Sequence, residues 1–226
     1  MRKLNPDLPA DPRRRQILKQ SCASVIALTA GPILSACHDS DDLSKMGGLS
    51  NIGNIGPLST TPDANGFLLP EGFTSRVLAI TDEQPIATSS YAWHDLPDGG
   101  ATFVTSNGGW IYVSNSEVDF GGGGVGALEF DADGEMIDAF QLISGTSKNC
   151  AGGPTPWDTW LTCEEVPTGT VWETYPLERG MRPAEQRAAL GVFQHEAAAV
   201  DPATSIVYLT EDQPDGCLYR FIPDNY

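Results

Sequence analysis

Short runs of alternating apolar and polar residues, separated by turn residues, fill the chain from Phe67 onward. An alternation of period two is typical of β-strands. It predicts strands over nine ranges: 76–80, 101–105, 110–114, 125–130, 137–143, 159–162, 170–173, 206–210 and 217–222. A helical signal is confined to 183–190, with a proline near its start and Gly191 at its end. The pattern therefore predicts an all-β fold.

Three segments repeat a strand that runs into an acidic end. They read W-I-Y-V-S-N-S-E at 110–117, D-T-W-L-T-C-E-E at 158–165 and S-I-V-Y-L-T-E-D at 205–212. A second short apolar run follows each segment. A repeat of roughly 40–50 residues with several strands per unit is typical of a β-propeller blade. We therefore expect a β-propeller, and the alternative is a β-sandwich whose strands are alike through shared β composition.

The length of the repeating region limits the number of blades. At roughly 45 residues per blade, the range 66–226 supplies three to four blades, fewer than a closed ring normally has. We therefore expect 66–226 to be the N-terminal part of a propeller domain. Further blades or partner chains would complete the ring.

The N-terminal region has the features of an export signal. R-R-Q-I-L-K at 14–19 resembles a twin-arginine motif and precedes a short apolar stretch. L-S-A-C at 34–37 resembles a lipobox, which would make Cys37 the lipidated first residue of the mature protein. The alternative is an ordinary signal peptide with an incidental cysteine.

These motifs predict three parts of the chain: a twin-arginine lipoprotein signal peptide at 1–36, a flexible tether at 37–65 and the folded region at 66–226. We expect the twin-arginine export machinery to carry the protein out of the cytoplasm. The lipid anchor would then hold it at the periplasmic or outer face of a bacterial membrane.

The charge balance narrows the choice of partners. The 226 residues include 13 lysines and arginines against 30 aspartates and glutamates, which gives a formal net charge of −17. This balance argues against nucleic acid as a partner, because so acidic a protein repels the phosphate backbone. An anionic substrate would need a bound metal or a local basic cluster to reverse the field.

The repeat places acids at equivalent strand ends. Glu117, Glu165 and Asp212 share the final position, and Glu211 immediately precedes Asp212. In a propeller, equivalent strand ends meet around one axis, where like charges at close range favour protonation or a bound cation. Ca²⁺ suits such a site because it takes about six to eight oxygen ligands. Acids solvated at the starts of loops are the alternative.

Two further candidates lie on the strands before these acids. Cys150 follows Asn149 in the second repeat, and Glu196 follows His195 in the third. A thiolate is a soft ligand that suits iron better than calcium. The alternative for Cys150 is a disulfide with Cys163 or Cys217.

Several long motifs resemble the PhoX-type alkaline phosphatases. They are G-F-L-L-P-E-G-F at 66–73, N-C-A-G-G-P-T-P-W-D-T-W-L-T-C-E-E at 149–165, G-V-F-Q-H-E-A-A-A-V-D-P at 191–202 and V-Y-L-T-E-D-Q-P-D-G at 207–216. Those enzymes are exported by the twin-arginine route, fold as β-propellers and hydrolyse phosphomonoesters with a calcium and iron cluster. The resemblance implies a metal-dependent phosphomonoesterase that acts on a small phosphate ester.

The resemblance also implies roles for individual residues. Cys150, Glu165 and Glu196 would be catalytic metal ligands for iron or calcium. Further metal ligands would come from Glu117, Glu211 and Asp212, and other candidates are Asn115, Asn149 and His195. Relatives are longer, and their later portion supplies more ligands and the basic residues that hold phosphate.

The sequence is also compatible with two other functions. One is a non-catalytic calcium-binding propeller module, and the other is a different metal-dependent hydrolase such as a phosphodiesterase. Cys150 close to Glu165 favours an enzyme over a structural calcium site, because calcium has no use for a thiolate.

Overall fold

The computed structural model describes residues 55–224 of the chain, which divides into two compact units, Met1–Ser75 and Arg76–Tyr226. The first unit contains an isolated β-bridge between Leu58 and Pro70 over its described residues. The expected signal peptide at 1–36 and the lipidation site Cys37 lie outside the described residues, as does the tether up to residue 54. No helix in the described part of the chain is long and apolar enough to span a membrane.

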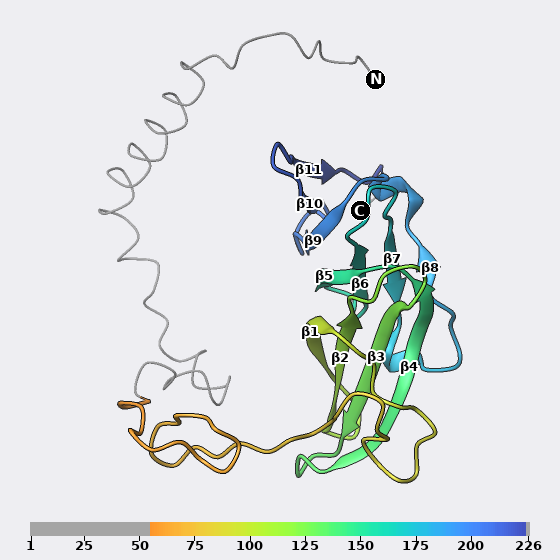
Figure 1. The fold of residues 1–226 in the computed structure, drawn as a ribbon. Coiled ribbons are helices and arrows are strands. Elements are labelled where there is room, and N and C mark those ends of the chain that lie inside the picture. Colours follow the sequence, from red (N-terminus) through yellow and green to blue (C-terminus); the bar gives the residue numbers. More distant parts are fainter. Residues whose placement is uncertain (1–54, 225–226) are drawn as a thin grey trace, which may run out of the picture. The chain divides into compact units, whose positions relative to one another are not determined.

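The second unit consists of three antiparallel sheets (Figure 1). The first sheet contains β1 (Pro97–Val104), β2 (Trp110–Ser116), β3 (Gly123–Phe130) and β4 (Met136–Thr146). The second contains β5 (Asn149–Pro154), β6 (Trp160–Glu164), β7 (Val171–Thr174) and β8 (Glu185–Gln186). The third contains β9 (His195–Val200), β10 (Val207–Glu211) and β11 (Leu218–Phe221). Each sheet is a meander, since hydrogen-bonded neighbours are always consecutive strands.

The prediction of an all-β fold is confirmed for the described residues, and eight of the nine expected ranges overlap strands. The expected strand at 76–80 is wrong. Its apolar residues Val77 and Ile80 are exposed, and no strand in the described residues pairs with it. An alternating pattern forms a strand only where a partner strand accepts its hydrogen bonds.

The helix expected at 183–190 is also wrong. The segment forms β8 and a single 3₁₀ turn, η4 (Ala188–Leu190). The backbone N–H of Arg187 donates to the carbonyl of Val171, and Leu190 packs in the core, so pairing with β7 overrides the helical pattern. Gly191 ends the turn as expected, with a φ of 97° that favours glycine.

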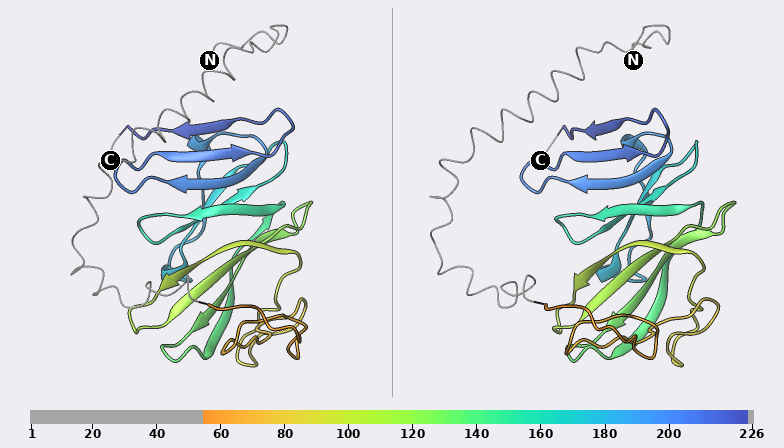
Figure 2. Two further views of the ribbon diagram at one scale, coloured as in Figure 1. Left: turned by 90° about the vertical axis from the view of Figure 1, so that its left-hand side faces the viewer. Right: turned by 60° about the vertical axis from the view of Figure 1, so that its left-hand side comes forward.

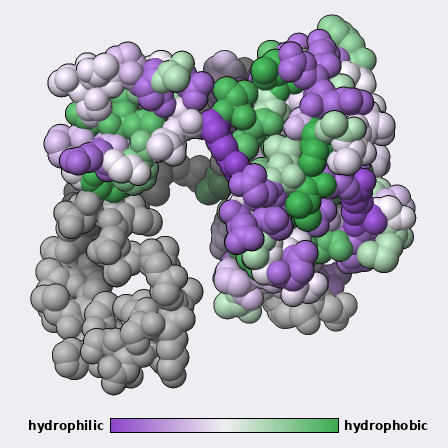
Figure 3. Space-filling view, turned by 90° about the horizontal axis from the view of Figure 1, so that it is seen from below, coloured by the Kyte–Doolittle hydropathy of each residue, from purple (hydrophilic) through white to green (hydrophobic). Residues whose placement is uncertain are grey.

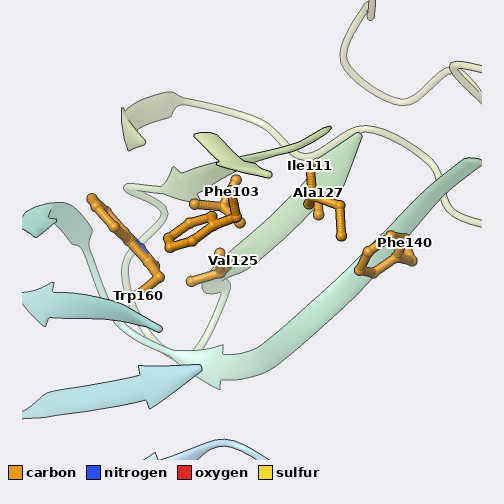
Figure 4. Close-up of a cluster of buried hydrophobic side chains, with 7 residues drawn as sticks. Phe103, Ile111, Val125, Ala127, Phe140 and Trp160 are labelled. Carbon is orange, nitrogen blue, oxygen red and sulfur yellow. The ribbon is translucent and has the colours of Figure 1, made fainter. Parts of the chain in front are cut away.

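Apolar clusters fill the spaces between successive sheets. Trp160 of β6 packs against Phe103 and Val125 of the first sheet (Figure 4). Another cluster joins the second and third sheets through residues that include Leu161, Val171 and Leu209. Full burial of a large apolar side chain contributes about 1.5–3 kcal/mol to the stability of the folded state. The two interfaces therefore fix the sheets relative to one another.

Glycines allow the first strands of the three sheets to pack closely. β5 lies between β1 and β9, and Figure 2 shows the sheets one above another. A Cβ atom on Gly153 of β5 would lie 1.8 Å from the carbonyl oxygen of Ala198 in β9. A Cβ atom on Gly99 of β1 would lie 2.8 Å from the Cα of Ala151. These close backbone contacts bring the first strands of the three sheets, β1, β5 and β9, side by side.

The surface mixes hydrophilic and apolar side chains, as the face in Figure 3 shows. In the third sheet, Leu218 is 71% exposed and Tyr208 is 38% exposed. Within the described residues, these side chains have no further sheet packed over them.

Candidate metal centre

Three acids occupy the same structural position in the three sheets. Glu117, Glu165 and Asp212 directly follow β2, β6 and β10. The backbone N–H of each acid donates to the carbonyl of the residue that precedes the first strand of its sheet: Leu96 at 2.9 Å, Lys148 at 2.9 Å and Gln194 at 3.1 Å. This repeated hydrogen bond holds each acid beside the start of the first strand of its sheet.

A β-bulge recurs at the start of each first strand. Two residues of the first strand oppose one residue of the second: Asp98 and Gly99 oppose Asn115, Cys150 and Ala151 oppose Cys163, and Glu196 and Ala197 oppose Thr210. A bulge redirects the side chains of its strand and often lies beside a functional site. Asp98, Cys150 and Glu196 therefore occupy equivalent positions.

The structure brings five of the six residues expected to bind metal into one group. Potential ligand atoms of Glu117, Cys150 and Glu165 all lie within 4.8 Å of one another, as do those of Glu165, Glu196 and Asp212. Glu165 belongs to both sets, and Sγ of Cys150 lies 3.5 Å from Oε1 of Glu196. We call these five residues the acidic centre. All three sheets contribute to it.

The structure does not bring Glu211, the sixth residue expected to bind metal, into the acidic centre. Oε2 of Glu211 accepts hydrogen bonds from the backbone N–H of Cys217 at 3.1 Å and from the hydroxyl of Tyr219 at 2.9 Å. Successive side chains of a strand point to opposite faces, so Glu211 and Asp212 do not share a direction. The role of Glu211 in this structure is to hold the turn between β10 and β11.

Asn115 positions Cys150 from the neighbouring sheet. Its side chain is fully buried, and Nδ2 donates to the carbonyls of Cys150 at 2.7 Å and Ala151 at 2.6 Å. Its Oδ1 accepts a hydrogen bond from Nε1 of Trp160 at 2.9 Å. All polar atoms of this amide are thus engaged by protein groups.

The side chains of Asn149 and His195 also make their contacts with other protein groups. Asn149 is buried between the hydroxyls of Thr146 and Thr162, at 2.5 and 2.9 Å. Nε2 of His195 donates to the carbonyl of Gly191 at 3.3 Å, and its ring stacks on Phe193. Burial lowers the pKa of His195, which favours the neutral imidazole. Its Nδ1 is buried without a hydrogen-bond partner.

Cys150 does not form the disulfide that was the alternative to metal binding. Cys150, Cys163 and Cys217 are all free. Cys163 is buried in the core between the second and third sheets, and Cys217 is exposed. The thiol of Cys150 is therefore free to act as a ligand.

The electrostatics of the acidic centre favour a cation. Burial raises the pKa of Glu165, and hydrogen bonds with the carboxyls of Asp212 and Glu117 add to this shift. Burial, followed by the charges of Asp212 and other acids, also raises the pKa of Glu196. The pKa of Cys150 is raised by burial and then by the charge of Glu196. Without a cation, these groups resist ionisation together.

The donor set fits the metals that the sequence suggests. Four carboxylates offer the oxygen ligands that calcium prefers, and one thiol offers the softer ligand that suits iron. Positive charge within the group would lower the pKa values of its members, because it favours their ionised forms.

Two neighbours of the acidic centre, Asp98 and Lys148, do not follow from the repeat in the sequence. Asp98 is 19 residues before Glu117, whereas Cys150 and Glu196 are 15 and 16 residues before their acids. A comparison by equal spacing therefore overlooks Asp98, and only alignment of the bulges reveals it. Lys148 was also missed, although it directly precedes the N-C-A-G-G motif. Its Nζ lies 3.8 Å from Glu117 and 3.9 Å from Glu165.

A family model described as alkaline phosphatase PhoX matches residues 115–174 and 167–226. Residues 115–226 thus match the PhoX family. The matched PhoX region contains every residue of the acidic centre.

A solved structure of PhoX from Pseudomonas fluorescens, in complex with the transition-state analogue vanadate, is similar to this chain. The TM-score is 0.50 and the sequence identity is 18%, with 58% of this chain and 41% of the Pseudomonas chain covered. The match thus spans about two fifths of that relative. At this identity the likeness shows a shared fold. A search of the curated proteins found no match.

Proposed function

We propose that this chain supplies metal ligands to a phosphomonoesterase of the PhoX type, which uses calcium and iron to hydrolyse small phosphate esters. The observation that carries the proposal is the convergence of Glu117, Cys150, Glu165, Glu196 and Asp212 from three sheets. This convergence lies within the region that the PhoX family model matches. A phosphate group can approach so acidic a centre only when cations reverse its sign.

The residues divide by the chemistry of their donor atoms. Glu117, Glu165, Glu196 and Asp212 would hold calcium through carboxylate oxygens, and Cys150 with Glu165 and Glu196 would hold iron. When bound, the metals would polarise the phosphate oxygens and neutralise charge on the leaving oxygen. The protein would keep the ligands in place, and Asn115 would fix the backbone that carries the thiol.

We further propose that the three sheets are blades of a β-propeller. Their strands follow chain order within each sheet, and their first strands lie side by side. A β-sandwich normally has strands that cross between two facing sheets, and no such crossing occurs among the described strands. The exposed apolar side chains of the third sheet are suited to a further blade.

The proposed location outside the cytoplasm depends on the sequence of the N-terminal region. The motifs at 14–19 and 34–37 support export by the twin-arginine route and lipidation of Cys37. Cys37→Ala should therefore move the protein from the membrane fraction to the soluble fraction of the producing bacterium. Retention in the membrane fraction would contradict the lipid anchor.

A direct test measures hydrolysis by the purified chain of p-nitrophenyl phosphate and of bis(p-nitrophenyl) phosphate. We expect monoester hydrolysis that chelation abolishes and that calcium with iron restores. Faster hydrolysis of the diester would instead indicate a phosphodiesterase. Tight calcium binding without turnover of either ester would indicate a non-catalytic calcium-binding module.

A further inference from the structure

Lys148 is held rigidly between the acidic ends of the first two sheets. Its backbone N–H donates to the carbonyl of Val118 at 2.9 Å, and its carbonyl accepts a hydrogen bond from the N–H of Glu165 at 2.9 Å. Its φ of 47° lies in the left-handed region, which non-glycine residues seldom adopt. These constraints fix the point from which its side chain extends.

The ammonium group of Lys148 bridges two members of the acidic centre. Its Nζ lies 3.8 Å from Oε1 of Glu117 and 3.9 Å from Oε2 of Glu165. The other ion pairs of lysine or arginine in the described residues involve acids outside the centre, namely Glu135, Asp138, Glu173 and Glu185. Lys148 is thus the basic residue that is paired with this group.

A metal ion would compete with Lys148 for the same oxygens. Calcium binds carboxylate oxygens at about 2.3–2.6 Å, much closer than the ammonium lies here. The ion pairs are loose, and the Lys148 side chain is 35% exposed on a flexible stem, so it can move at little cost. Its fixed backbone would nevertheless keep the displaced ammonium next to the metals.

If metals in the acidic centre bound a phosphate, the Lys148 ammonium would lie close to that phosphate, because it already lies within 4 Å of two of the ligands. An ammonium is a good partner for a phosphate, because it donates charge-assisted hydrogen bonds to oxygens in several directions. We propose that Lys148 alternates between two partners: the Glu117–Glu165 pair in the metal-free protein and the phosphate group of the substrate in the metal-loaded protein. This inference rests on the function proposed above.

Calorimetric titration of metal-free protein with CaCl₂, and then with inorganic phosphate, tests both halves of the proposal. Lys148→Met removes the charge and keeps a long side chain. It should bind calcium about two- to fivefold more tightly, since a partly exposed ion pair no longer competes. The loaded variant should bind phosphate about tenfold more weakly, because a charge-assisted hydrogen bond is lost. These opposite shifts distinguish the proposal from a purely structural role.

Two control variants accompany the test. Lys148→Arg keeps the charge and should retain both affinities to within about threefold. Arg76→Met removes one positive charge from the turn region around Glu135, where it pairs outside the acidic centre, and should leave both affinities unchanged. Equal effects of Arg76→Met and Lys148→Met would reduce the role of Lys148 to net charge and overturn the proposal.

Other outcomes are also decisive. Unchanged affinities in Lys148→Met, or a parallel loss of calcium and phosphate binding, would overturn the role of Lys148 while the proposed metal site stands. Absence of calcium binding in the wild-type chain would overturn the proposed function itself, and this inference with it.

Discussion

Glu165 has the most connections of any residue in the acidic centre. It is close to Glu117 and Cys150 on one side and to Glu196 and Asp212 on the other. Its side chain is only 11% exposed, and burial raises its pKa. A carboxyl group whose pKa is higher in the folded than in the unfolded chain opposes folding when both states are ionised. That opposition fades as the pH falls through the folded pKa towards the unfolded one.

Glu165→Gln should therefore stabilise the metal-free protein at pH 8. We expect its melting temperature to rise by about 2–4 °C, the shift that about 1 kcal/mol gives in a domain of this size. The difference from wild type should disappear near pH 4, about the pKa of an unperturbed glutamate. Thermal unfolding in chelator at several pH values measures it.

Calcium should reverse the order of stability, because the variant loses a ligand. Glu135→Gln is a suitable control, since Glu135 is an exposed side chain outside the acidic centre. It should change the melting temperature by little at any pH. A Glu165→Gln variant that is less stable than wild type in chelator at pH 8 would contradict this view of the site.

The sequence predicted some residues of the site and not others, for physical reasons. Glu117, Glu165 and Asp212 were predictable because their strands repeat without gaps. The position of Glu211 follows from the alternation of side chains along β10, which the repeat alone does not reveal. Lys148 could not be found from the repeat, because its role depends on a backbone held between two sheets.

At the scale of elements, the close packing of β5 on β9 brings Cys150 towards Glu196. β5 reads N-C-A-G-G-P and β9 reads H-E-A-A-A-V, and their small residues allow the two backbones to approach. The same small residues have weak strand propensity, so alternation failed to predict these two strands. The stronger strands β2, β3, β4, β6 and β10 were predicted well.

Gly153→Ala tests this packing. Its new Cβ would lie 1.8 Å from the carbonyl oxygen of Ala198, so β5 and β9 would have to move apart. We expect a loss of about 3 kcal/mol in the free energy of unfolding, at the upper end for overpacking. Calcium binding should weaken as well, since Glu196 moves with β9. Chemical denaturation and calorimetry measure the two effects.

Gly180→Ala is the matched control for this change. Its φ of 70° is strained for alanine, but nothing lies within 4 Å of the new Cβ. It should cost about 1 kcal/mol and leave calcium binding unchanged. Gly153 has no positive φ, so its loss must come from the contact with Ala198; equal losses in the two variants, with calcium binding unchanged in both, would contradict this role of the packing.

At the scale of the whole molecule, three meanders place their acidic strand ends together on a chain of net charge −17. The repeat predicted this arrangement in outline, because equivalent segments of one chain form equivalent sheets. It could not predict the bulges that aim Cys150 and Glu196, since a bulge depends on pairing between strands. The proposed function depends on the binding of iron and calcium by the acidic centre.

Elemental analysis of purified wild type, Cys150→Ala and Cys217→Ala, each produced in medium with iron and calcium, would show whether the acidic centre holds these metals. Cys217 is the control, since it is an exposed thiol outside the acidic centre. We predict iron and calcium in wild type and in Cys217→Ala, and loss of iron from Cys150→Ala with calcium retained. Iron at wild-type stoichiometry in Cys150→Ala, or no metal in the wild-type protein, would contradict the account.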